Sequence, residues 1–115
     1  MEIGIKLWST NPDKYVDNAG FADFVEVMAA EMRGVRRFAK KPYRYTVHVP
    51  HESFGFNPFL NYSKSKRLLE RAIKASRLLK ADWVIMHNVH MSTKPDEKTS
   101  AEAVKAVARL VKSSG

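Results

Sequence analysis

The chain has 115 residues, enough for one domain, with an ordinary globular mix of 44% hydrophobic and 28% charged residues. It has no cysteine, which excludes disulfides and thiolate metal sites, so any metal ion would need His, carboxylate, Asn or water ligands. No apolar run approaches the ~20 residues of a membrane span. The acidic start at Met1-Glu2 is not followed by the apolar core of a signal peptide. We therefore expect a cytoplasmic protein with no membrane partner.

The formal net charge is +8, from 20 Lys and Arg residues against 12 Asp and Glu residues. A basic surface suits a partner rich in phosphate. The same excess would arise in a basic half-protein whose acidic half is missing, or on a heat-adapted surface. The basic residues are spread over Lys40–Lys41, Lys64–Arg77 and Lys105–Lys112 and form no single tract. Charge alone therefore leaves the partner open.

The first half of the chain alternates strands with short helices. Apolar residues at every second position predict a strand over Glu2–Trp8. Pro12 can begin a short helix that runs to Phe21. Phe24–Met28 is the second predicted strand, and Glu31–Lys41 is a short basic helix that ends before Pro42. Tyr45–Val49 is the third predicted strand, ended by Pro50.

The second half repeats the pattern after a loop. Ser63 is the expected N-cap of a helix whose apolar positions run to Leu79 at helical spacing. Asp82–Asn88 is the fourth predicted strand and is apolar on both faces. Thr99–Glu102 resembles a capping box that begins the last helix, and Ser113–Gly115 is its expected C-terminal cap.

Strands that alternate with helices predict a parallel sheet with right-handed crossovers. Two architectures fit four such units: half of a (β/α)8 TIM barrel, or a small open sheet with helices on one or both faces. Lys6, Glu26 and His48 fall at alternating positions of their strands, as if they lined a common interior, which favours the half barrel. A complete barrel needs about 250 residues. We therefore predict an α/β fold in which residues 1–115 form four parallel βα units, half of a TIM barrel.

All four histidines lie in or just after the third and fourth predicted strands, namely His48, His51, His87 and His90. Because these strands would be neighbours in a parallel sheet, His51 and His87 should meet at one rim, within reach of a shared divalent metal ion. The alternative is that surface loops simply carry histidines. His48 lies inside its strand, where it could be a ligand, a group that orients a ligand, or a hydrogen-bonded core histidine; we favour the latter two.

Glu26 occupies a strand otherwise made of Phe, Val and Met. A carboxylate in such a place is unfavourable unless it is paired or bound to a metal ion. Two interpretations remain open at this point: a catalytic carboxylate, or an ion pair with Lys6 on the neighbouring first strand.

One segment carries a family resemblance. Pro50-His51-Glu52-Ser53-Phe54-Gly55-Phe56-Asn57 resembles the Pro-His-Asp/Glu-Ser-aromatic-x-x-Asn segment after the third strand of endonuclease IV. That enzyme belongs to the xylose-isomerase-like TIM-barrel superfamily (apurinic endonuclease family 2). Gly4–Leu7, Phe24–Val27 and Ala81–His87 resemble the first, second and fourth strands of the same superfamily.

The resemblance implies that His51 and His87 are metal ligands, with zinc as the expected metal. It also implies that Phe54 presents an aromatic ring to DNA and that Asn57 supports the loop. The family's bridging Glu on the fifth strand and its later ligands have no counterpart in these residues. Two departures, Asn88-Val89 in place of Pro-Gly and Gly55 at an apolar wedge position, leave room for the sugar isomerase and epimerase branch.

Three functions follow as hypotheses. The first is a metal-dependent phosphodiester hydrolase that acts on abasic DNA when its barrel is complete. The second is an isomerase or epimerase of a sugar or sugar phosphate, in which carboxylates move protons. The third is a non-catalytic half barrel that pairs with a second copy or with a missing second half. We assign Lys6, Phe54 and Asn57 to substrate binding and Glu26 and His48 to catalysis, and we expect the chain by itself to be inactive.

Overall fold

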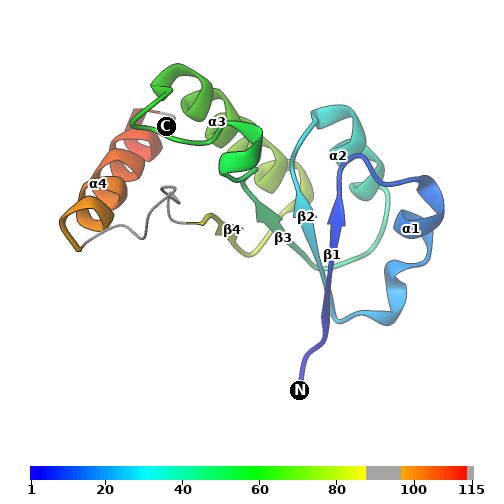
Figure 1. The fold of residues 1–115 in the computed structure, drawn as a ribbon. Helices are drawn as coiled ribbons and strands as arrows, with labels where there is room; N and C mark the ends of the chain where they lie inside the picture. The colour runs from blue at the N-terminus through cyan, green and yellow to red at the C-terminus, as the bar shows by residue number, and fades with distance from the viewer. Residues whose placement is uncertain (88–96, 114–115) are drawn as a thin grey trace.

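The computed structural model describes residues 1–87 and 97–113 (Figure 1). In this part of the chain, four strands and four α-helices alternate, with two short 3-10 turns. The strands are β1 (Gly4–Trp8), β2 (Phe24–Met28), β3 (Tyr45–His48) and β4 (Val84–Ile85). The helices are α1 (Asp13–Asp17), α2 (Met32–Phe38), α3 (Tyr62–Leu79) and α4 (Glu97–Ser113), and the 3-10 turns are η1 (Ala19–Phe21) and η2 (Glu52–Phe54).

The strands form one parallel sheet in the order β1-β2-β3-β4. The predicted parallel α/β fold is therefore confirmed. Lys6 lies opposite Glu26, and Met28 lies opposite His48. Because side chains alternate across a strand, this register divides the sheet into two faces of different character.

One face of the sheet carries the core. Its buried residues come from alternating strand positions, and they pack with apolar residues of all four helices. The strand members of this core are Leu7, Val25, Val27, Tyr45 and Val47, and the helix members include Val16, Val35, Phe38, Leu69 and Leu110. Lys6, Glu26 and His48 point to the other face of the sheet. No strand residue on that face belongs to the core cluster found among the described residues. We call this other face the polar face; it carries Lys6, Glu26, Thr46 and His48, together with Trp8, Phe24, Met28 and Ile85.

Several helix boundaries differ from the predictions because other residues serve as caps. The N-cap of α3 is Asn61, whose Oδ1 accepts a hydrogen bond from the Lys64 backbone N–H at 3.0 Å, so Ser63 lies within the first turn. The helix ends at Lys80, which adopts a left-handed conformation with φ of 52°. Helix α4 begins at Glu97, so the predicted capping box at Thr99 is wrong.

Strand β2 has the predicted bounds, and several other elements are shorter than predicted. Helix α1 ends at Asp17 and is followed by η1, and Glu31 is the N-cap of α2 rather than a helical residue. Strand β4 contains only two residues, although backbone hydrogen bonds join its surroundings to β3 from Asp82 to Ile85. Three parts of the predictions lie outside the described part of the chain: Asn88 at the end of the fourth strand, His90, and the last two residues.

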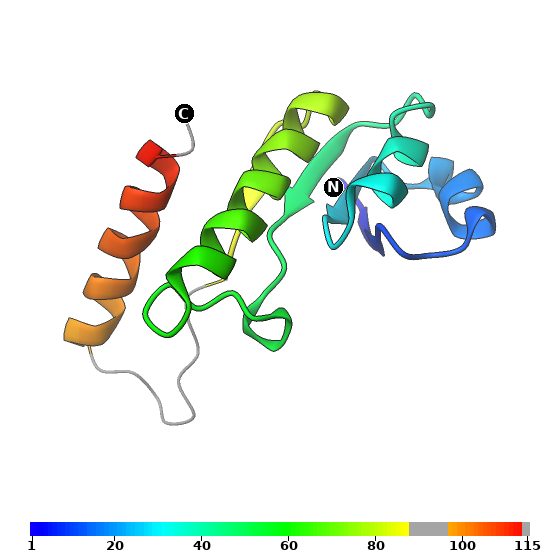
Figure 2. The same cartoon turned by 90° about the horizontal axis from the view of Figure 1, so that it is seen from above.

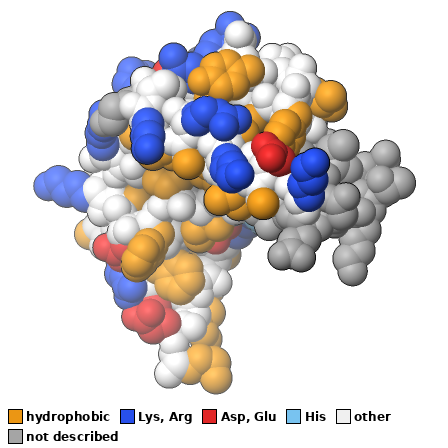
Figure 3. All heavy atoms as spheres, turned by 90° about the vertical axis from the view of Figure 1, so that its left-hand side faces the viewer, with side chains coloured by type: hydrophobic (Ala, Val, Ile, Leu, Met, Phe, Trp, Pro, Cys, Tyr) orange, Lys and Arg blue, Asp and Glu red, His pale blue; other side chains and the backbone are white. Residues whose placement is uncertain are grey.

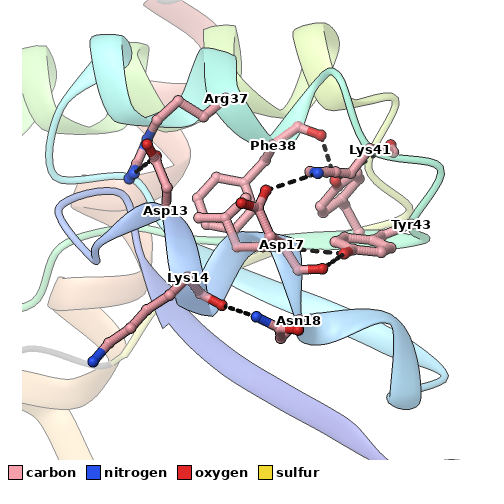
Figure 4. Close-up of polar contacts among 10 residues, drawn as sticks. Asp13, Lys14, Asp17, Asn18, Arg37, Phe38, Lys41 and Tyr43 are labelled. Carbon is pink, nitrogen blue, oxygen red and sulfur yellow. Dashed lines mark hydrogen bonds and ion pairs between the residues drawn. The ribbon is translucent and has the colours of Figure 1, made fainter.

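Polar contacts fasten α1 to α2 and to the start of β3 (Figure 4). Asp13 pairs with Arg37 at 2.7 Å, and Asp17 pairs with Lys41 at 2.7 Å. The hydroxyl of Tyr43 donates to the carbonyl oxygen of Val16 at 2.9 Å. These contacts tie α1 to α2 and to the segment between α2 and β3.

Seen from above, α3 lies along β3, and α4 lies on the outer side of α3 (Figure 2). The side of the molecule that carries α4 is rich in Lys and Arg side chains, with hydrophobic side chains between them (Figure 3). The exposed basic residues of α4 are Lys98, Lys105, Arg109 and Lys112. Among the described residues, no helix is both long enough and apolar enough to cross a membrane.

Candidate functional site at the carboxyl edge of the sheet

Three imidazole rings meet at the carboxyl ends of β3 and β4. His48 is the last residue of β3, His51 follows it by three residues, and His87 follows β4 by two. The ring centroids of His48 and His87 are 4.6 Å apart, and those of His51 and His87 are 6.1 Å apart with planes inclined by 18°. The prediction that His51 and His87 share one rim is confirmed.

His48 is a buried, neutral imidazole, and one of its two ring nitrogens makes a hydrogen bond. The residue is 1% exposed, and its Nδ1 lies 2.7 Å from the carbonyl oxygen of Val49. Because a carbonyl only accepts, Nδ1 carries the proton and Nε2 carries a lone pair. That Nε2 has no hydrogen-bond partner among the described residues, which is unusual for a buried polar atom. Burial lowers the pKa of His48, and the positive charge of Lys6 lowers it further.

The ring of His51 is oriented by its neighbours. Its Nδ1 lies 2.7 Å from the hydroxyl oxygen of Ser53, and aromatic rings from Trp8 and Phe54 lie beside it at centroid distances of 6.3 and 5.3 Å. Trp8 and Phe54 also contact each other, at 5.2 Å. Neither Ser53 nor Trp8 was predicted from the sequence to have a role at this site. Their signals were a hydroxyl within the Pro-His-Glu-Ser motif and an aromatic residue at the end of β1.

The described residues do not form a complete set of metal ligands. Zinc usually has three or four protein ligands, and the described residues contain no group of three or more His, Cys, Asp or Glu side chains placed to hold a metal ion. The stacked pair of His51 and His87 could supply two nitrogen ligands, and a complete site would need others. The expected zinc site stays a prediction.

Glu26 and Lys6 pair with each other on the polar face. Lys6 Nζ lies 3.2 Å from Glu26 Oε1, and the Glu26 side chain is only 20% exposed. The ion-pair interpretation of Glu26 is therefore confirmed. In the sheet, His48 lies opposite Met28, which is two residues beyond Glu26 on the same face of β2. The ion pair is therefore one row of side chains away from His48. Catalysis by Glu26 and substrate binding by Lys6 stay predictions.

Asn57 supports the loop that carries Phe54. The residue is 4% exposed, and its Oδ1 accepts hydrogen bonds from the backbone N–H groups of Phe59 and Leu60 at 3.2 and 3.3 Å. Its own backbone N–H donates to the buried Ser65 hydroxyl at 2.8 Å, which ties the loop to α3. This geometry fits a supporting role for Asn57 better than direct contact with a substrate. Phe54 itself is 40% exposed.

A pocket of about 310 Å³ lies beside Phe54, which also contacts the rings of Trp8 and His51. This pocket was not predicted from the sequence. We call it the basic pocket. Its lining residues are Ala30, Pro50, Phe54, Lys64, Arg67, Leu68 and Arg71. Three of these side chains are cationic and come from one face of α3. Their spacing of three and four residues places the three cations on one side of the helix, but the approach of Ala30 and Phe54 to them depends on tertiary contacts.

Comparison with models of protein families found no match to this chain, and comparison with curated proteins found none either. The resemblance to the xylose-isomerase-like superfamily therefore stays a prediction that rests on the residues quoted for it.

Proposed function

We propose that this chain is half of a xylose-isomerase-like barrel and that the complete barrel is a divalent-metal-dependent phosphodiester hydrolase acting on abasic DNA. The observation that carries the proposal is the meeting of the His51 and His87 rings, 6.1 Å apart, at the carboxyl edge of neighbouring parallel strands. Barrel enzymes build their active sites at that edge. In the described part of the chain, all four helices contribute to the core on one face of the sheet, as helices do around a barrel wall.

The residues of the rim have distinct roles in this proposal. Ser53 holds the Nδ1 side of the His51 ring and so leaves Nε2 as the nitrogen for a ligand. The exposed ring of Phe54 offers a surface on which a base could stack. A bound divalent ion would supply a hydroxide nucleophile and stabilise charge on the phosphate. The remaining ligands would come from a second half, either elsewhere in a longer chain or from a second copy.

The Lys6–Glu26 pair favours a second candidate, an isomerase or epimerase of a sugar or sugar phosphate. The pair lies on the polar face, and both side chains are partly accessible, at 39% and 20%. A carboxylate next to a lysine could take part in proton transfer to or from a bound carbohydrate.

Zinc titration by calorimetry tests the metal ligands. We expect the wild-type chain to bind zinc weakly and His51→Gln and His87→Gln each to weaken binding at least about tenfold, since each removes one of two nitrogen ligands. Glu102→Gln, which changes an exposed residue of α4, is the control and should bind zinc as the wild type does. Equal zinc affinity in all four proteins would refute the ligand assignment.

Activity assays separate the two candidate chemistries. The chain alone should not incise a duplex that contains an abasic site at a normal enzymatic rate, because the two proposed histidine ligands fall short of the three or four protein ligands that zinc usually has. Normal incision by the purified chain would overturn the half-barrel proposal. Preferential binding of a sugar phosphate over abasic DNA, in the presence of zinc, would favour the isomerase candidate instead.

A further inference from the structure

The basic pocket gathers positive charge, and no described side chain supplies a counter-ion there. Lys64, Arg67 and Arg71 line it, and no Asp or Glu is among the lining residues within the part of the chain that the structure describes. Spacings of three and four residues place these side chains on the same face of α3. Within the described residues, none of the three forms an ion pair, whereas Lys66 on the same helix pairs with Glu70 at 3.7 Å. Like charges held close together are unfavourable, and a bound anion would relieve that repulsion.

One of the cations is hydrogen-bonded across the pocket, and a second lies against the loop that carries Phe54. A terminal nitrogen of Arg71 donates to the carbonyl oxygen of Ala30, in the connection that follows β2. The Lys64 side chain passes directly over Gly55, where an added Cβ would lie 2.6 Å from Lys64 Nζ. Gly55 has a φ of +92°, so glycine both permits the turn and leaves room for the lysine. Lys64 and Phe54 both line the pocket.

The location and size of the pocket fit a phosphorylated ligand. Lys64 lies in the first turn of α3, where the helix dipole also favours negative charge. A volume of about 310 Å³ equals that of roughly ten water molecules in the liquid, which leaves room for a phosphate and part of an attached sugar. The half-exposed ring of Phe54 forms an apolar wall on which that sugar or a base could rest.

We propose that the basic pocket binds a phosphate group, with the rest of the ligand against Phe54. Guanidinium and ammonium groups are the side chains best suited to phosphate oxygens. The site goes beyond the proposed function, because it assigns Lys64, Arg67 and Arg71, to which the metal chemistry gives no role. Its ligand could be the backbone of DNA or a sugar phosphate, which share this phosphate chemistry.

The test uses a pair of variants matched in charge. Lys64→Gln/Arg67→Gln removes two pocket cations, and Lys74→Gln/Lys105→Gln removes two exposed lysines outside the pocket. All four positions are exposed, so we expect both variants to fold, and circular dichroism checks this. The probes are inorganic phosphate, ribose 5-phosphate and a labelled single-stranded DNA 12-mer. Binding is measured with EDTA present, so that failure of the metal-site proposal does not affect the result.

The expected result is a loss of at least about tenfold in affinity for the preferred probe in the pocket variant and less than about twofold in the control, since the pocket cations make charge-assisted hydrogen bonds. Tighter binding of the 12-mer than of ribose 5-phosphate would identify a nucleic-acid backbone as the ligand, and the reverse would identify a sugar phosphate. The proposal is overturned if no probe binds, or if both variants weaken binding equally, because general surface charge would then explain the affinity.

Discussion

Replacing Gly34 with alanine should destabilise the protein, although alanine is the better helix former. Gly34 lies within α2, and a Cβ added there would be 1.6 Å from the carbonyl oxygen of Ser9. Real Cβ atoms essentially never approach another heavy atom closer than 3.0 Å, so the backbone of α2 or of the loop after β1 would have to move. No flexible side chain is available to give way, because the contacted atoms belong to the main chain.

The displaced loop also contributes hydrogen bonds that hold α2. Ser9 is fully buried; its carbonyl oxygen accepts from Arg37 at 2.8 Å, and its hydroxyl accepts from the backbone N–H of Glu31 at 2.9 Å. Overpacking against main chain costs about 1–3 kcal/mol, and each disturbed hydrogen bond about 1 kcal/mol more. The better helix propensity of alanine offsets only about 1 kcal/mol. We expect a net loss of about 3 kcal/mol in the free energy of unfolding, a fall of roughly 10 °C in Tm.

Urea and thermal unfolding, followed by circular dichroism, measure this effect against a matched control. Gly20→Ala places its Cβ 3.6 Å from a ring carbon of Tyr43, an ordinary van der Waals contact, and should change stability by less than about 1 kcal/mol. If Gly34→Ala proves as stable as Gly20→Ala, the close contact between α2 and the loop after β1 is refuted.

Three further predictions concern buried and paired polar groups. The hydroxyl of Tyr45 donates to the carbonyl oxygen of Phe38, and burial raises the pKa of this hydroxyl. The contribution of the protonated hydroxyl to the free energy of unfolding should therefore be complete below about pH 10 and should be lost as pH rises above that value. Tyr45→Phe should therefore unfold more easily at pH 7 but lose less stability between pH 9 and 11 in urea titrations, and parallel pH curves for the two proteins would contradict this. Asn57→Ala should lower the free energy of unfolding by about 1–3 kcal/mol, because two backbone N–H groups lose their acceptor; a change below ~0.5 kcal/mol would show that the loop does not depend on it. Glu26→Gln should lower stability by less than about 1 kcal/mol, as expected of a partly exposed ion pair with Lys6, and a much larger loss would mean that Glu26 has a buried structural role.

The sequence by itself determined the elements and their order. Alternating apolar residues identify strands, and a spacing of three to four identifies helices, because these periods follow from backbone geometry alone. The alternation of strand and helix then requires a parallel sheet, since short hairpins cannot join such strands. His51 and His87 could be placed at one rim for the same reason, without knowledge of any side-chain contact.

The helix ends were less predictable because several residues could serve as caps. Asn61 and Ser63 are both good N-cap residues, and only the backbone conformation at Asn61 selected it. The length of β4 likewise depends on the strands that can pair with it. Among the described residues, β4 pairs only with β3.

Tertiary structure alone decided which polar groups meet. Lys6 and Glu26 are 20 positions apart, and the strand register, not their local sequence, makes them a pair. The burial of His48, and the lack of a partner for its Nε2 among the described residues, follow from how the chain surrounds the end of β3. The basic pocket needs Ala30, Phe54 and Arg71 from three segments, and a pattern read along the chain contains no distances between segments. Side-chain chemistry can be read from sequence, but the distances that turn it into a site are set by how the segments pack.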